Sequence, residues 1–223
     1  MTYLRKVSAI VWKDVTAELR TKDIFSAMFV FALLAVVIFQ FAFDLRADNV
    51  KLVAPGVIWV AITFAGVLGL SRSFILEQDR GSLEGLLLAP VDRSAIYFGK
   101  LIGNLLFIFV VELLLLPAAS IFFNISLVSP GLLLVVALGT VGFASVGTLF
   151  AALSVNTRAR EVLLPILLFP IMVPVLIAGV RATGSLLDGE PLSEISNWLR
   201  LLVAYDVIFL AAAFLLFDYV VEE

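Results

Sequence analysis

Six long apolar runs constrain the fold of this chain more than any other feature of its sequence. Each run is close to the roughly 20 residues that an α-helix needs to cross the hydrocarbon core of a bilayer, and a helix satisfies its own backbone polar groups in lipid. The predicted spans are residues 24–43, 53–76, 101–123, 130–154, 162–180 and 199–220.

Composition supports the same interpretation. Of the 223 residues, 62% are hydrophobic and only 15% are charged, whereas about a quarter of the residues in a soluble domain are charged. Connections between the runs are short. We therefore expect an all-α integral membrane protein with six transmembrane helices, in which residues 24–223 form one domain.

Residues 1–23 are too polar to cross a membrane, but they have helical periodicity. Apolar residues recur at spacings of three and four, and the basic residues lie off that stripe. This pattern predicts an amphipathic helix at the inner membrane surface, with Trp12 at the level of the lipid headgroups. The alternative is a polar leader whose periodicity is accidental. The apolar stripe is Leu4, Val7, Val11, Val15 and Leu19.

Lysines and arginines predict the orientation, because loops on the cytoplasmic side are enriched in them. With the N-terminus in the cytoplasm, eleven of the 15 fall inside and four outside. We therefore expect both termini in the cytoplasm and a multi-pass protein of the inner membrane. The four outside are Arg46, Lys51, Arg181 and Arg200.

The segment 74–100, "FILEQDRGSLEGLLLAPVDRSAIYFGK", is a polar interruption between the second and third spans. A serine can cap a short helix, a glutamate follows in its first turn, leucines form an apolar face, and a proline ends it. This predicts a short amphipathic cytoplasmic helix, a sharp turn, and a second helix that starts at Asp92 or Ser94 and continues into the third span. Such an arrangement can receive movement from a soluble partner. The alternative is a loop that only connects two spans. The predicted partner-binding residues are Arg80, Ser82, Leu83, Glu84, Leu86, Leu87, Pro90 and Arg93.

Two acidic residues fall inside predicted spans, Glu112 in the third and Asp206 in the sixth. Ionisable groups at membrane depth are costly and often functional, so both are candidates for a polar path or for proton coupling. Each could equally be a buried polar contact with no further role.

The fifth span contains Pro165, Pro170 and Pro174. Each proline removes a backbone donor and clashes with the preceding turn, so the helix should bend or break there. The bend could be a hinge, or a static kink set by packing. Small residues at every fourth position of two other spans predict close helix packing, which we expect within one chain. They are Ala61, Ala65, Gly69 and Ser73, and Thr140, Ala144, Thr148 and Ala152.

The residue types needed for most catalysis are missing. The chain has no cysteine and no histidine, and it has no phosphate-binding glycine-rich loop. We therefore expect no enzyme activity in this chain, no catalytic residue, and no metal or cofactor bound directly. The net charge of −3 gives no reason to expect nucleic-acid binding.

The pattern Leu83-Glu84…Leu87…Pro90-Val91…Arg93…Ile96…Gly99-Lys100 resembles the cytoplasmic turn of ABC-2 type permeases. Two further stretches, "APGVIWVA" (54–61) and "LPILLFPIMVPVLIAG" (164–179), with "GSLEGLLLAP" between them, resemble the CcmB (haem exporter protein B) family. The match extends over most of the chain.

The resemblance implies a permease subunit of the ABC transporter for cytochrome c maturation. In that family a permease dimer joins a separate CcmA-like ATPase, which uses ATP, and CcmC-like and CcmD-like membrane subunits. The segment 82–90 would be the coupling helix that docks on the ATPase. ATP hydrolysis would release the haem-loaded chaperone or drive haem export. Because haem is ordinarily ligated by His, Cys, Met or Tyr and the first two are absent, the residues favour a mechanical role over haem binding.

Three other functions fit the sequence. An ABC-2 exporter of lipid, drug or glycan would have the same coupling helix. A secondary transporter would rely on Glu112 or Asp206 and need no ATPase. A membrane scaffold would move nothing and only hold assembly factors together.

Overall fold

The computed structural model describes residues 2–43, 47–79, 85, 91–155, 157 and 159–220. Within these residues the chain forms seven long helices and no strand. The helices are α1 (Tyr3–Thr21), α2 (Asp23–Ala42), α3 (Ala47–Asp79), α5 (Arg93–Phe123), α6 (Pro130–Val155), α7 (Arg160–Leu187) and α8 (Ser196–Val220).

Six of these helices, all except α1, are long and apolar enough to cross a membrane, which confirms the predicted fold class. The helices extend beyond the apolar runs. Helix α5 starts at Arg93, which confirms the helix predicted to begin at Asp92 or Ser94 and to continue into the third span. Helix α7 continues to Leu187 rather than ending at 180. The predicted coupling helix, 82–90, lies outside the described residues apart from Gly85.

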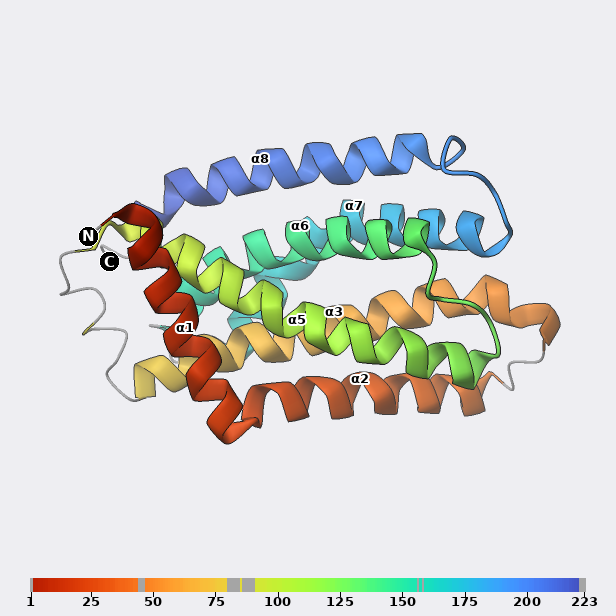
Figure 1. Ribbon diagram of the computed structural model, residues 1–223, viewed down its shortest axis with the longest axis horizontal. Coiled ribbons are helices and arrows are strands. Elements are labelled where there is room, and N and C mark those ends of the chain that lie inside the picture. The colour runs from red at the N-terminus through yellow and green to blue at the C-terminus, as the bar shows by residue number, and fades with distance from the viewer. Residues whose placement is uncertain are drawn as a thin grey trace.

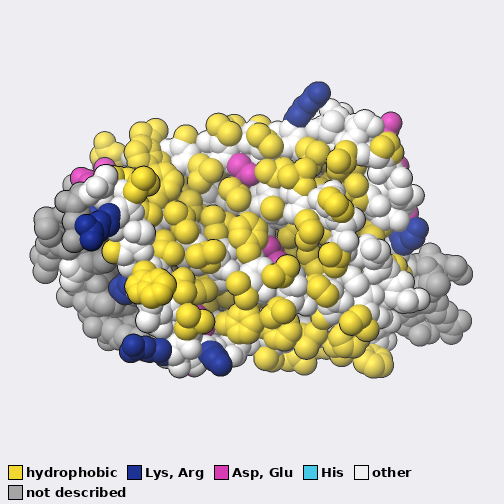
Figure 2. All heavy atoms as spheres, in the orientation of Figure 1, with side chains coloured by type: hydrophobic (Ala, Val, Ile, Leu, Met, Phe, Trp, Pro, Cys, Tyr) yellow, Lys and Arg dark blue, Asp and Glu magenta, His cyan; other side chains and the backbone are white. Residues whose placement is uncertain are grey.

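The spanning helices form a bundle with α3 and α6 at its centre (Figure 1). In the 18-residue apolar stretch of α3, 67% is buried inside the protein, and in that of α6, 72% is buried. The corresponding share is 22% in both α2 and α8. Helix α2 packs on α3 and α5, and α8 packs on α6 and α7. Figure 2 shows hydrophobic side chains over the middle of one face, with lysines and arginines towards the two ends.

Glycines allow the central helices to approach closely. The indole of Trp59 lies against Gly139 of α6 and Gly179 of α7, where an added Cβ would come within 2.2 and 2.4 Å of it. The small residues predicted to pack closely are buried inside this chain, which confirms packing within one chain.

Helix α1 does not follow the bundle axis. It crosses the end of the bundle at which α8 finishes, and both chain termini lie there (Figure 1). We call this the proximal end, and the opposite one the distal end. At Lys22 the backbone turns from α1 into α2 with a left-handed φ of 58°.

Candidate functional site

The proximal end is held together by contacts between α1 and the first turns of α5. The hydroxyl of Tyr3 donates a hydrogen bond to Ser94 Oγ at 3.3 Å. Lys6 Nζ forms an ion pair with Asp92 at 3.3 Å, at the N-cap of α5. Both contacts are solvent-exposed, so each contributes little stability on its own.

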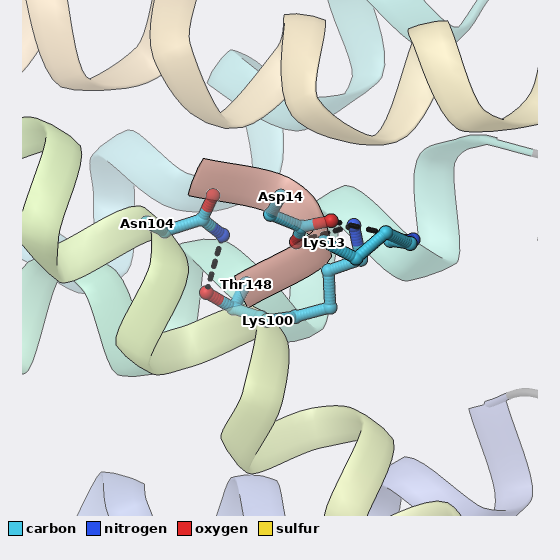
Figure 3. A network of polar contacts seen from close by, with 5 residues as sticks. All are labelled: Lys13, Asp14, Lys100, Asn104 and Thr148. Atoms are coloured by element: carbon cyan, nitrogen blue, oxygen red, sulfur yellow. Dashed lines mark hydrogen bonds and ion pairs between the residues drawn. The ribbon is translucent and has the colours of Figure 1, made fainter. Parts of the chain in front are cut away.

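A buried ion pair lies further along the same interface (Figure 3). Lys100 Nζ lies 2.9 Å from Asp14 Oδ2, and the lysine side chain is only 1% exposed. Its ammonium also lies 5.4 Å from the ring centroid of Phe74. Lys13 Nζ approaches the other Asp14 oxygen, Oδ1, at 3.3 Å. Because a buried charge is costly without its partner, the pair fixes the position of α1 on α5.

The close approach of the two helices depends on glycine. A Cβ added at Gly99 would lie 2.7 Å from Ile10 Cγ2, so only glycine fits there without displacing α1. One turn beyond Lys100, the Asn104 amide donates to Thr148 Oγ1 of α6 at 3.1 Å. Polar contacts therefore connect α1 through α5 to the centre of the bundle.

Glu18 fixes the corner between α1 and α2. Its Oε1 accepts a hydrogen bond from the backbone N–H of Phe25 at 2.8 Å, which satisfies a free donor in the first turns of α2. Burial raises the pKa of the Glu18 carboxyl above its ordinary value, although the N–H groups of Phe25 and Ile24 partly offset this.

The predicted partner-binding residues Arg80, Ser82, Leu83, Glu84, Leu86, Leu87 and Pro90 lie outside the described residues. Arg93 is described, and its Nη1 donates to the carbonyl of Asp218 in α8 at 3.0 Å. In the sequence, these residues lie between the end of α3 and the start of α5, and both of those helix ends lie at the proximal end.

The two intramembrane acids approach α6 from different helices. Glu112 of α5 accepts a hydrogen bond from the Thr140 hydroxyl, while its Oε2 is buried with no hydrogen-bond partner among the described residues. On α8, Asp206 Oδ1 is also buried and has no partner in the part of the chain that the structure describes. This oxygen lies beside Gly142, where an added Cβ would be 2.6 Å from it.

Helix α7 continues unbroken through Pro165, Pro170 and Pro174. The hydroxyl of Tyr205 in α8 donates to the carbonyl of Ile171, between the second and third prolines, at 3.2 Å. A complete break is therefore wrong, whereas the hinge stays a prediction.

Sequence reasoning missed Asp14, Glu18 and Asn104. Leu4 and Leu19 of the predicted stripe are 74% and 70% exposed, so they remain available to a membrane surface, whereas Val7 is buried. The face against the bundle contains Val7, Ile10, Asp14 and Glu18. A carboxylate on this face is a local signal of a buried pair, but its partner Lys100 is 86 residues away in the sequence.

Comparison with known proteins identifies the family. A family model described as CcmB protein matches residues 5–220. The heme exporter protein B of Pseudomonas aeruginosa is 30% identical over 176 residues, which cover 78% of this chain and 79% of that protein.

Two other relatives have the same name. The heme exporter protein B of Rhodobacter capsulatus is 28% identical over 183 residues, covering 78% of this chain and 80% of that protein. The heme exporter protein B of Escherichia coli K12 is 30% identical over 97 residues, which cover 42% of this chain and 44% of that protein. With six spanning helices and a family match over nearly its whole length, this chain is a multi-pass membrane protein of the CcmB family.

Proposed function

We propose that this chain is the membrane permease subunit of an ATP-driven complex for cytochrome c maturation. In this proposal it transmits movement from a separate CcmA-like ATPase to CcmC-like and CcmD-like membrane partners, and it acts as a homodimer in the complex. The family and the names of the relatives support a role connected with haem export. The complex as a whole, and not this chain, would handle haem.

The observation that carries the proposal is the buried Asp14–Lys100 pair at the proximal end. The segment 80–92 is followed in the sequence by α5, and Lys100 lies in the second turn of that helix, so a push on the segment would act on the start of α5. There α1 is fixed to α5, and Asn104 connects α5 to α6. These contacts run from the first turns of α5 to the bundle centre.

The proposal requires the proximal end to face the cytoplasm, where ATP is available. The excess of lysine and arginine predicted on this side supports that orientation. Exposed apolar side chains on one side of α1 also support contact with the inner membrane surface. These are Leu4, Trp12 and Leu19.

The chain's residues also bear on whether it carries haem itself. It has no histidine or cysteine to ligate the iron. Of its possible weaker ligands, Met28 and Met172 are packed in the core at 1% exposure. A mechanical role therefore fits better than direct haem transfer.

The test is co-purification of the ATPase subunit with a Leu86→Asp variant, which places a charge on the predicted apolar docking face. We expect the variant to insert in the membrane at normal levels but to lose the ATPase. The matched control is Leu192→Asp, because Leu192 is a half-exposed leucine between α7 and α8 at the distal end. Co-purification of the ATPase with Leu86→Asp in the same ratio as with the unmodified chain would contradict the docking assignment.

A second candidate function is ion-coupled transport. It is supported by Oε2 of Glu112, which is buried and has no hydrogen-bond partner among the residues that the structure describes. Such a transporter would need the ionisable group itself, whereas the mechanical role needs only the hydrogen bond from Thr140. Substitution of Glu112 by glutamine separates the two functions.

A further inference from the structure

A groove between α3 and α7 has two parts that share Val180. The part nearer the bundle centre, the inner slot, has a volume of about 290 Å³. The part nearer the distal end, the outer mouth, has a volume of about 650 Å³. The function proposed above involves neither part of this groove.

The inner slot is apolar and open to the side of the bundle. Its walls include Trp59, Phe64, Phe169 and Leu176. Trp59 is held rigidly, because its Nε1 donates to Thr183 Oγ1 at 3.0 Å. A Cβ added at Gly56, which also lines the slot, meets no atom within 4 Å. The slot is therefore real unfilled space beside a fixed aromatic wall.

The outer mouth carries two cations, Lys51 from α3 and Arg181 from α7, together with Ser185 and one acid, Asp188. Neither cation makes an ion pair or side-chain hydrogen bond within the part of the chain that the structure describes. The groove therefore has an apolar inner part and an outer end with two positive charges available to a ligand.

We propose that this groove binds an anionic phospholipid, with its phosphate at Lys51 and Arg181 and an acyl chain in the inner slot. The apolar lining of the inner slot suits an acyl chain, and the two cations of the outer mouth suit the phosphate of the same lipid. Cations near the membrane surface attract anionic headgroups, and each contributes about a fivefold gain in affinity.

The experiment is native mass spectrometry of the purified chain, titrated with phosphatidylglycerol or with phosphatidylcholine of the same acyl chains. We expect a bound phosphatidylglycerol and weaker binding of phosphatidylcholine. The double variant Lys51→Gln/Arg181→Gln should lose about 25-fold in affinity for phosphatidylglycerol and bind both lipids alike. The matched control Arg200→Gln removes a distal-end cation outside the groove and should bind as the unmodified chain does.

A second variant tests the inner slot. Gly56→Leu fills the open space, and leucine is a better helix former than glycine, so the fold is preserved. We expect weaker binding of both lipids with an unchanged melting temperature. Unchanged lipid binding in both the double variant and Gly56→Leu would overturn the proposal.

Two further outcomes would also overturn it. Haem has an apolar ring with two carboxylates, so haem binding that is lost in the same variants would make haem the occupant. The chain has no cysteine, so Val60→Cys introduces a single thiol in the slot. Efficient disulfide formation between two copies in membranes would show that a second copy covers the groove. This proposal does not rest on the proposed function, because it needs no ATPase.

Discussion

At the scale of single residues, the intramembrane acid Glu112 is held by a contact that does not require its charge. Glu112 accepts a hydrogen bond from Thr140, and a glutamine side chain has a carbonyl oxygen that can accept the same bond. Both groups are buried in the bundle. Position 112 can therefore show whether the carboxyl group or only its hydrogen bond is needed.

We expect Glu112→Gln to retain cytochrome c maturation, because the contact with α6 is preserved. Glu112→Leu should reduce the amount of protein in the membrane, because it leaves the Thr140 hydroxyl without a partner at a cost of about 1–3 kcal/mol. Haem staining of c-type cytochromes, normalised to chain abundance by immunoblot, measures both. Loss of maturation in Glu112→Gln at normal abundance would favour ion-coupled transport.

Glu18 predicts a dependence of stability on pH. Its folded-state pKa lies above the ordinary 4.5, so between these two values the folded chain holds more protons than the unfolded chain. Protonation of Glu18 therefore stabilises the folded chain, and this stabilisation is lost as the pH rises through the folded-state pKa. Glutamine at position 18 still accepts from the Phe25 N–H but does not titrate.

We expect Glu18→Gln to become progressively more stable than the unmodified chain as the pH rises above 4.5. Thermal unfolding in detergent between pH 4.5 and 7.5 measures the difference. Glu18→Ala is the control, because it loses the hydrogen bond to α2 and should be less stable than Glu18→Gln at every pH. A difference between the unmodified chain and Glu18→Gln that is constant with pH would exclude this role.

At the scale of elements, α1 has two distinct faces, whereas the apolar stripe in its sequence predicts only one. Leu4, Trp12 and Leu19 are exposed, and by helical spacing they lie within one arc. The adjacent arc contains Ile10 and Asp14 and packs against α5. One arc therefore suits the membrane surface, and the other fixes the helix to the bundle.

The Asp14–Lys100 pair can be tested by charge exchange. Asp14→Ala removes the carboxylate that contacts Lys100, and Lys100→Ala removes the buried ammonium that contacts Asp14. Removing one partner of a buried ion pair costs up to about 3–5 kcal/mol. We expect Asp14→Lys/Lys100→Asp to recover part of this stability, because the opposite charges meet again. The measurement is thermal unfolding in detergent, together with ATP hydrolysis by the purified complex.

A purely structural role and a role in transmission give different results in that experiment. If the pair transmits movement, the exchanged variant should bind the ATPase normally but couple hydrolysis to maturation less well, since the geometry of the pair has changed. The control is Lys6→Gln, which removes an exposed ion pair with Asp92 and should have little effect. Full coupling in a stable Asp14→Asn variant would contradict transmission through the pair.

Most elements could be predicted from the sequence, whereas the contacts between them could not. The spans followed from hydropathy because lipid requires long apolar helices. Hydropathy reports only the apolar part of a helix, so the first two turns of α5 are predicted from the capping residues Asp92 and Ser94 instead, and the structure confirms them. The pairing of Asp14 with Lys100 depends on how α1 crosses the bundle, and no local pattern encodes that crossing.

At the scale of the whole molecule, the two ends of the bundle differ. The proximal end has a transverse helix and a buried ion pair, whereas the distal end has loops and the outer mouth of the groove. The function proposed here needs the proximal end in the cytoplasm, while the lipid groove needs only a membrane around the bundle. The proposed transmission role therefore depends on the orientation of the chain in the membrane, whereas the proposed lipid binding does not.

The absence of cysteine makes orientation directly measurable. Single thiols at exposed positions of the two ends, Thr21→Cys at the proximal end and Leu192→Cys at the distal end, can be labelled with a membrane-impermeant maleimide. In intact spheroplasts we expect labelling of Leu192→Cys alone, with Thr21→Cys labelled only after lysis, because lysine and arginine concentrate on the cytoplasmic side. The unmodified chain controls for background. Labelling of Thr21→Cys in intact spheroplasts would place α1 and the coupling segment away from ATP, and a lever driven by a cytoplasmic ATPase could not then operate.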